Sequence, residues 1–194
     1  MTDLDRAVAA LRAGELVVYP TETVYGLGAD ALDADAVDRV FAAKGRPRSN
    51  PISLAVPSVE TALEYVETDQ RERQFMETFL PGPVTVVLRK RPAVPDALTG
   101  GRERVGVRVP DHDLARRLAE RAGPVTATSA NVSGNPSVTD PANLDDAIRE
   151  AASVVLDGGQ TPGTASTVVD VGRGTVHREG RDADAIREWL AAHR

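Results

Sequence analysis

The chain has 194 residues, 41% of them hydrophobic, which is enough material for the core of one domain. It contains no cysteine and three histidines, so disulfides, thiolate nucleophiles and zinc–thiolate sites are excluded. The formal net charge of −6 argues against a broadly basic, nucleic-acid-binding surface, but it leaves room for a local basic cleft.

In chain order, the N-terminal residues are charged and helical in pattern, and no apolar run reaches the length of about 18 residues that a membrane span requires. We therefore expect a cytoplasmic protein without membrane contact. Helical and extended patterns then alternate. Helices are expected over residues 3–13, 33–45, 58–66 and 69–80, and strands over residues 16–19, 52–56 and 84–88.

The second half continues this alternation. Strands are expected over residues 105–109, 125–128 and 154–156, helices over 111–123 and 144–151, and a hairpin over 167–178. Asp182 is expected to cap a final helix. Because both hairpin-length and helix-length connections occur, we predict one α/β domain over residues 1–194 with a mixed sheet.

Polar, glycine-rich segments lie between these elements, at residues 20–28, 44–51, 129–139 and 158–166. Loops that leave one edge of an α/β sheet tend to converge on a ligand crevice. These loops carry hydroxyls, asparagines and cations, but no evident acid/base pair. This chemistry favours a site that holds an anionic, hydroxyl-bearing ligand.

The clearest cation cluster is Lys44, Arg46 and Arg48. A solvated basic loop is the simpler explanation of such a run, whereas an anion such as phosphate would offset the repulsion between three neighbouring cations. Only Lys44 and Lys90 are lysines, which suggests that a compact ammonium is needed at residue 44. We expect Lys44 at a helix end beside a polar loop, away from the apolar face.

Two other features give weaker signals. Residues 26–31 match the dinucleotide-binding fingerprint in letters, but no helix is expected to open at these glycines. His112 is expected in the first turn of a helix, as a surface residue and not as a catalytic base.

Eight segments, taken together and in order, resemble the threonylcarbamoyl-AMP synthase family, whose domain is called YrdC-like. They are spread over roughly residues 15 to 180, which is nearly the whole chain, and are residues 19–28, 44–47, 50–51, 81–85, 107–110, 128–134, 166–170 and 178–180. The resemblance implies a twisted mixed sheet with helices around a concave, positively lined face. The chain is most similar to the short, single-domain type of this family.

The resemblance also implies a reaction. L-threonine, bicarbonate and ATP would give threonylcarbamoyl-AMP and pyrophosphate, for the N6-threonylcarbamoyladenosine (t6A) modification of tRNA. This chemistry depends on positioning and charge neutralisation more than on proton transfer by side chains, so the lack of an acid/base pair agrees with it. Mg²⁺ would accompany ATP. A tRNA threonylcarbamoyl-transferase complex would receive the adenylate, and weak RNA binding is a further expectation.

Roles for individual residues follow from the same resemblance. The catalytic residues would be Lys44, Arg46, Ser129 and Asn131. The nucleotide would contact Arg46, Asn50, Arg104, Asn131, Thr139 and Arg178. The threonine would contact Thr23, Arg108, Ser129 and Ser166, and a guanidinium at residue 108 is suited to grip an α-carboxylate with two hydrogen bonds.

The chain departs from the family pattern at two positions. Many relatives carry a histidine where Ala55 stands here, and often a threonine where Arg104 stands. Two alternatives stay open: a fold paralogue without this activity, such as a relative of the carbamoyl-transfer domain in hydrogenase maturation, and a non-catalytic RNA-binding module. The Lys-x-Arg and Ser-x-Asn pairs favour the synthase over the paralogue, and the net charge of −6 disfavours the RNA-binding module.

Overall fold

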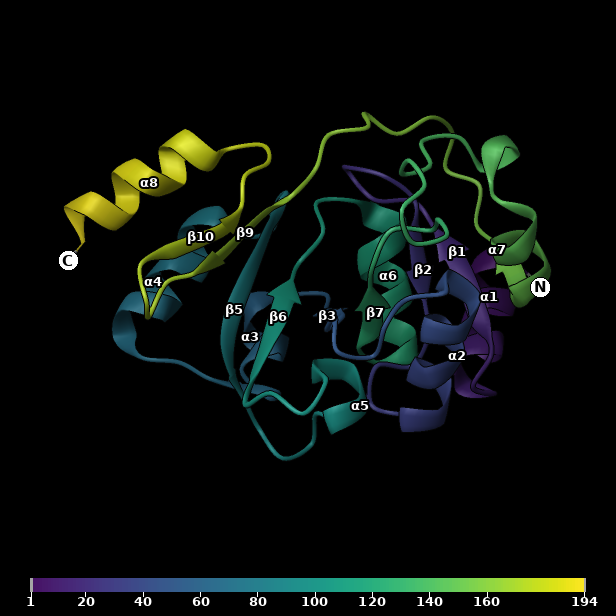
Figure 1. Ribbon diagram of the computed structural model, residues 1–194, viewed down its shortest axis with the longest axis horizontal. Helices are drawn as coiled ribbons and strands as arrows, with labels where there is room; N and C mark the ends of the chain where they lie inside the picture. Colours follow the sequence, from purple (N-terminus) through teal and green to yellow (C-terminus); the bar gives the residue numbers. More distant parts are fainter. Residues whose placement is uncertain (1, 194) are drawn as a thin grey trace.

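A computed structural model of the chain describes residues 2–193, whose strands form two sheets (Figure 1). The strands are β1 (Leu16–Tyr19), β2 (Gly26–Gly28), β3 (Ser53–Ala55), β4 (Val66–Glu67), β5 (Val84–Lys90), β6 (Arg104–Arg108), β7 (Val125–Ala127), β8 (Ala152–Val155), β9 (Thr167–Asp170) and β10 (Thr175–Arg178). The helices are α1 (Asp3–Arg12), α2 (Ala34–Lys44), α3 (Val59–Ala62), α4 (Gln70–Phe79), α5 (Asp96–Thr99), α6 (Asp113–Ala122), α7 (Asp146–Ala151) and α8 (Ala183–Ala192), with a 3₁₀ turn η1 (Pro141–Asn143).

The larger sheet is mixed, as expected from the sequence. Its order is β10-β9-β5-β6-β3-β7, with β4 paired to β5 outside this path. The central pair β5–β6 is antiparallel, whereas β5–β9 and β3–β6 are parallel. The smaller sheet has the order β2-β1-β8, in which β1 pairs with β2 antiparallel and with β8 parallel.

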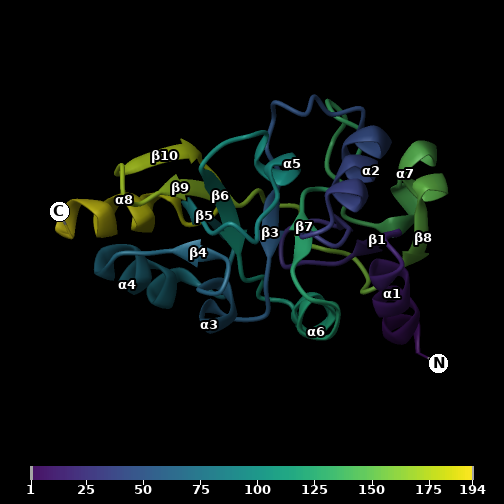
Figure 2. The ribbon, with the colours of Figure 1, turned by 90° about the horizontal axis from the view of Figure 1, so that it is seen from below.

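The two sheets meet where β2 runs along β7. The amide of Leu27 donates to the carbonyl of Thr128 at 2.8 Å, and the amide of Thr126 donates to the carbonyl of Ala29 at 2.9 Å. Seen from below in Figure 2, the strands therefore form one series from β9 and β10 near the C-terminal end to β8 near the N-terminal end. Helices α1, α3, α4 and α6 lie on one side of this series, and α2, α5 and α7 lie on the other.

Local sequence explains the main helices. Thr2 accepts from the amide of Asp5 and closes a capping box at the start of α1. Asp33 accepts from the amides of Asp35 and Ala36 at the start of α2, and Gly45, with φ of 56°, ends that helix in the left-handed region. Both ends of α2 agree with the prediction.

Several short elements differ from the expectation. The predicted helix over residues 58–66 is reduced to α3, and strand β4 follows it. Strand β8 begins at Ala152, directly after α7, and not at residue 154. Asp182 stands at the N-cap position of α8, as predicted, but its φ is 67° and its side chain makes no capping hydrogen bond.

Strand β2 was not predicted because its glycines indicate a loop. The structure explains them, since the ring of Tyr19 lies across both glycines. A Cβ atom at Gly26 would lie 2.9 Å from this ring, and one at Gly28 would lie 3.0 Å from it. Within residues 2–193, no helix is both long and apolar enough to cross a membrane.

Candidate functional site

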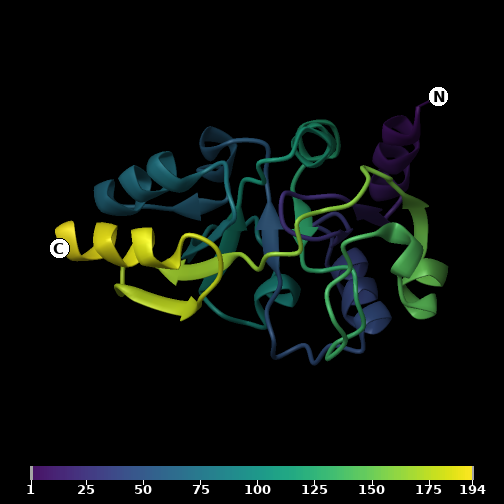
Figure 3. The same ribbon diagram turned by 90° about the horizontal axis from the view of Figure 1, so that it is seen from above.

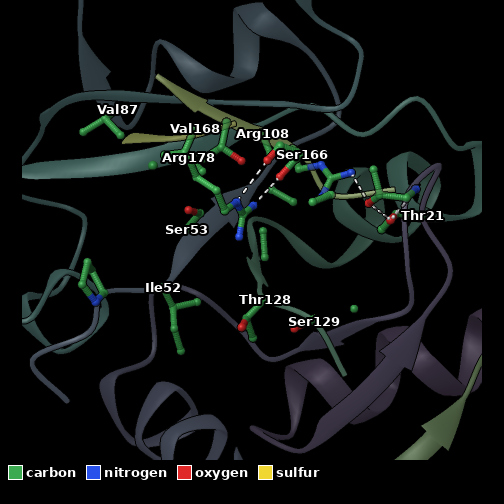
Figure 4. A pocket seen from close by; sticks show the side chains of 18 of the residues that line it. Thr21, Ile52, Ser53, Val87, Arg108, Thr128, Ser129, Ser166, Val168 and Arg178 are labelled. Carbon is green, nitrogen blue, oxygen red and sulfur yellow. Dashed lines mark hydrogen bonds between the residues drawn. The ribbon is translucent and has the colours of Figure 1, made fainter. Parts of the chain in front are cut away.

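A cavity of about 700 Å³ lies where the two sheets meet. All four polar segments singled out in the sequence supply lining residues, so their predicted convergence is confirmed. Examples are Thr21, Arg46, Ser129 and Ser166. Figure 4 shows Arg108, Ser166 and Arg178 together, across the cavity from Thr128 and Ser129.

The structure brings seven of the predicted site residues to the cavity wall. They are Thr23, Arg46, Arg104, Arg108, Ser129, Ser166 and Arg178. The other predicted residues, Lys44, Asn50, Asn131 and Thr139, do not line it.

Arg46 extends from the loop after α2 into the cavity. Its Nε donates to the carbonyl of Asn50 at 3.0 Å, and its Nη2 donates to the carbonyl of Pro51 at 3.1 Å. Asn50 thus contributes its main chain to the site, while its side chain is exposed. Burial lowers the pKa of the Arg46 guanidinium, which has no salt bridge to a carboxylate among residues 2–193.

Arg178, at the end of β10, is held by Ser166. Its Nε donates to the Ser166 carbonyl at 3.1 Å, and its Nη2 donates to the Ser166 Oγ at 2.8 Å. Burial lowers the pKa of Arg178, and the positive charges of Arg108 and Arg46 lower it further. The recorded partners of Arg46 and Arg178 are neutral oxygens, so their charge is available to an anion in the cavity.

Arg108, at the end of β6, has one acidic partner. Its Nη2 lies 2.9 Å from Glu22 Oε1 and donates to Thr23 Oγ1 at 2.7 Å. The Thr23 hydroxyl in turn lies 2.9 Å from that of Thr21. Glu22 was not predicted as a site residue, although it lies between two threonines that line the cavity.

Arg104, at the start of β6, binds two carboxylates and a carbonyl of the protein itself. Its Nη2 lies 3.0 Å from Asp170 Oδ1 and 3.3 Å from Glu72 Oε1, and it donates to the Val87 carbonyl at 2.9 Å. These ion pairs connect β6 with β9 and α4. The predicted contact of Arg104 with a nucleotide stays a prediction.

Lys44 differs from the expectation in its burial. It is the last residue of α2, as expected, but its side chain is 2% exposed and belongs to the buried face of the helix with Val40 and Phe41, so the expectation that it lies away from the apolar face is wrong. Its Nζ donates to the carbonyls of Ser129 and Asn131, the latter at 2.7 Å. The pKa of Lys44 is lowered to about 8, mainly by burial and also by the positive charge of Arg46, while the negative charge of Asp145 acts in the opposite direction.

The remaining predicted residues lie behind the cavity wall. Asn131 is 6% exposed, and its Nδ2 donates to the carbonyls of Val132 and Asn135 at 2.9 and 2.8 Å. Thr139 is half-buried, and its carbonyl accepts from the amide of Thr161 at 2.9 Å. Their proposed ligand contacts stay predictions.

His112 is half-buried at the start of α6, and not exposed as expected. Burial lowers its pKa, while Glu22 and two neighbouring aspartates raise it. Residues 26–31 open no helix, which agrees with the rejection of a dinucleotide fingerprint. Among residues 2–193, no group of three or more histidine, aspartate or glutamate side chains is arranged to hold a metal ion.

The connection over residues 156–166 forms one side of the site, and Figure 3 shows it crossing from β8 to β9. The amide of Gly163 donates to the carbonyl of Thr23 at 2.7 Å. The hydroxyl of Tyr25 donates to the carbonyl of Gly159 at 2.6 Å. The connection is therefore tied to the loop that carries the Arg108 partners.

Comparisons with known proteins agree with this arrangement. Residues 9–180 match the Sua5, YciO and YrdC family model, whose description is telomere recombination. The threonylcarbamoyl-AMP synthase of Pyrococcus abyssi (strain GE5 / Orsay) is 44% identical over 169 residues, which cover 85% of this chain and 49% of that protein. The enzyme of the same name from Bacillus subtilis (strain 168) is 40% identical over 171 residues, covering 84% and 49%.

A solved structure gives the same result. The structure of P. abyssi Sua5 complexed with L-threonine superposes with a TM-score of 0.89 at 38% identity, covering 100% of this chain and 59% of that one. The chain thus spans about half the length of these curated relatives. On the extent of the family match and the identity to these relatives, the chain belongs to the Sua5/YciO/YrdC family.

Proposed function

We propose that the protein is a threonylcarbamoyl-AMP synthase, a nucleotidyltransferase that uses L-threonine, bicarbonate and ATP. One observation carries this proposal. Arg46 and Arg178 reach one cavity from different segments, and their recorded hydrogen bonds go to neutral oxygens. Uncompensated guanidiniums in a partly enclosed site favour a polyanion such as a nucleotide triphosphate.

The threonine would lie near Arg108. Its carboxylate would accept hydrogen bonds from this guanidinium, and its hydroxyl would be within reach of Thr23 and Ser166. Support comes from the position of all three side chains on the cavity wall and from a related protein, P. abyssi Sua5, that was solved with L-threonine. Ser129, across the cavity, would contact the reacting groups.

The proposed reaction has two steps. The threonine ammonium first loses its proton to solvent, and the neutral amine attacks the carbon of bicarbonate, so that one water leaves as the carbamate forms. A carbamate oxygen then attacks the α-phosphorus of ATP, the bond between this phosphorus and the β-phosphate oxygen breaks, and pyrophosphate leaves. Positioning and electrostatic stabilisation would supply most of the rate acceleration, from Arg46 and Arg178 directly and from Lys44 behind the wall.

Mg²⁺ is expected with ATP. The described residues form no cluster of acidic or histidine side chains suited to a resident metal. Its ligands would therefore be the phosphates of the nucleotide, and we derive no step through it.

The product defines the class of partner. A mixed anhydride of a carbamate and AMP is reactive towards water, so a transferase that acts on tRNA would need to receive it promptly. We propose hand-over to a tRNA threonylcarbamoyl-transferase complex for t6A formation. Weak RNA binding at the arginine-lined cavity is a further expectation.

The test is product analysis after incubation with ATP, L-threonine and bicarbonate. We expect threonylcarbamoyl-AMP and pyrophosphate, with ATP consumption that requires threonine and bicarbonate together. Arg46→Gln should reduce product formation, whereas Arg48→Gln, which removes an exposed guanidinium paired with Asp38, should not. Release of phosphate, or turnover indifferent to threonine, contradicts the proposal. Salt-dependent RNA binding without ATP turnover would favour the RNA-binding module instead.

A further inference from the structure

Asp145 stands at the N-cap position of α7 but does not cap its own helix. Aspartate at this position ordinarily accepts from the amides of the first helical turn. Here both carboxylate oxygens turn to the loop over residues 131–135. Oδ2 accepts from the amide of Val132 at 2.8 Å, and Oδ1 accepts from Nδ2 of Asn135 at 3.0 Å.

The same loop is held from its other side by Lys44. The Lys44 Nζ donates to the carbonyls of Ser129 and Asn131, and the Lys44 carbonyl accepts from the amide of Ser133 at 2.8 Å. Within the loop, Asn131 Nδ2 donates to the carbonyl of Asn135 at 2.8 Å. The loop is therefore clamped between the end of α2 and the start of α7.

Charge gives this clamp a second effect. The charged groups that act on the Lys44 ammonium are Arg46, which disfavours it, and Asp145, which favours it. Lys44 is 2% exposed, so solvent screens these interactions poorly. Asp145 therefore acts in the direction that favours the Lys44 ammonium, although the hydrogen bonds of Nζ go to two carbonyls and not to this carboxylate.

We propose that Asp145 is a positioning residue of the site: its two hydrogen bonds fix the 131–135 loop, and with it Ser129 and Asn131, whose carbonyls bind Lys44. The proposal rests on the proposed function for its kinetic consequences. Its structural consequences can be measured without turnover.

The kinetic test compares Asp145→Asn with Asp146→Asn, a matched change at an exposed neighbour outside the clamp. Asp145→Asn should lower kcat/KM by about 10- to 100-fold, the range for loss of a hydrogen bond to a charged group. In the pH profile of kcat/KM, the alkaline limb of Asp145→Asn should also lie at lower pH than that of the wild type. Asp146→Asn should match the wild type in both respects. Ionisation of the substrates affects the pH profiles of all variants equally, so it does not contribute to differences between them.

Asn135→Ala separates the two effects. It removes one hydrogen bond to Asp145 and keeps the carboxylate charge. We expect a lower kcat/KM with the alkaline limb in the wild-type position. If Asn135→Ala moves the alkaline limb as far as Asp145→Asn does, then the order of the loop controls the protonation of Lys44, and the expected effect of the Asp145 charge is wrong.

A readout without turnover uses the fact that Lys44 and Lys90 are the two lysines of the chain. Lysine-selective labelling would give two side-chain NMR signals, and Lys90→Gln would assign them. In Asp145→Asn, the pH midpoint of the titration of the Lys44 signal should fall, and the Val132 amide hydrogen should exchange faster with solvent. Neither quantity should change in Asp146→Asn. An unchanged midpoint and unchanged exchange would overturn the proposal. If these shifts occur but the wild type forms no adenylate, the proposed function fails and the clamp stands.

Discussion

The Arg108 guanidinium lies 2.9 Å from the Glu22 carboxylate, and the two side chains are only 11% and 13% exposed. The cation proposed to hold the threonine carboxylate is therefore already paired with a carboxylate of the protein. Glu22 limits where the guanidinium can point, and it lowers the positive charge that an incoming carboxylate meets. A ligand must share Arg108 with Glu22.

Arg108→Lys is the first substitution to test. An ammonium cannot keep the contacts to Glu22 and Thr23 and also make two parallel hydrogen bonds to a carboxylate. We expect threonine to bind about 10- to 100-fold more weakly, at a cost of about 1.5–3 kcal/mol. ATP affinity should change much less. Calorimetric titration with each ligand measures this, and equal losses for both ligands would show that Arg108 has been assigned to the wrong substrate.

Arg104 tests a different kind of ion pair. Arg104→Ala leaves Asp170, which is 1% exposed, and Glu72 without their shared guanidinium. Loss of one partner from a buried pair costs about 3–5 kcal/mol, so the free energy of unfolding should fall by this amount in denaturant titrations. Arg173→Ala, which removes a 70% exposed side chain 3.8 Å from Asp170, should change it by less than about 0.5 kcal/mol. Similar losses for both variants would contradict this difference.

Lys44→Arg should be harmful although it keeps the charge. The side chain is enclosed and its Nζ is bound to two carbonyls, so the wider guanidinium would displace the loop that carries Ser129 and Asn131. We expect kcat to fall by about 10²-fold, the scale for loss of one electrostatic stabiliser. Because Lys44 is buried, Lys44→Ala should also lower the free energy of unfolding by about 1–3 kcal/mol. Steady-state adenylate formation with parallel thermal melts tests both, and near wild-type turnover of Lys44→Arg would refute the requirement for an ammonium.

The pH dependence of Lys44 should separate stability from activity. Its pKa is about 8 in the folded chain, below the ordinary lysine value of 10.5 that applies to the unfolded chain, so between these pH values the unfolded chain holds the extra proton. Stability from this group therefore rises as the pH increases from about 8 to 10.5. Over the same range kcat/KM should decline, because the free enzyme loses the ammonium. In unfolding titrations, the free energy of unfolding should change more favourably from pH 7 to pH 10 for the wild type than for Lys44→Met.

The sequence predicts most of the fold because its signals there are local. The start of α2 follows from Asp33 and its end from Gly45, and the hairpin of β9 and β10 follows from two β-branched runs around glycines. Strand β2 could not be predicted, because glycine is needed there only to make room for the ring of Tyr19, which packs across Gly26 and Gly28 from the neighbouring strand.

In the site, too, features set by local sequence could be predicted, and features set by long-range contacts could not. The polar loops reveal that a cavity should form, and seven predicted residues line it. The burial of Lys44 could not be predicted, because its acceptors, the carbonyls of Ser129 and Asn131, are 85 and 87 residues away. Glu22 and Asp145 were not predicted for related reasons. Glu22 pairs with Arg108, which is 86 residues away, and Asp145 accepts from the main-chain amide of Val132. Long-range hydrogen bonds leave no periodicity in a sequence.

The parallel pairing of β1 with β8 has a consequence for the order in which the chain can fold. Val17 pairs with Val154, so β1 leaves the ribosome long before its parallel partner β8 exists. Until then, the only strand of the smaller sheet with which β1 can pair is β2. Because contacts between distant residues form slowly, the smaller sheet closes late during synthesis. The cavity, whose walls belong to both sheets, acquires its final shape only after this pairing and the still later pairing of β9 with β5.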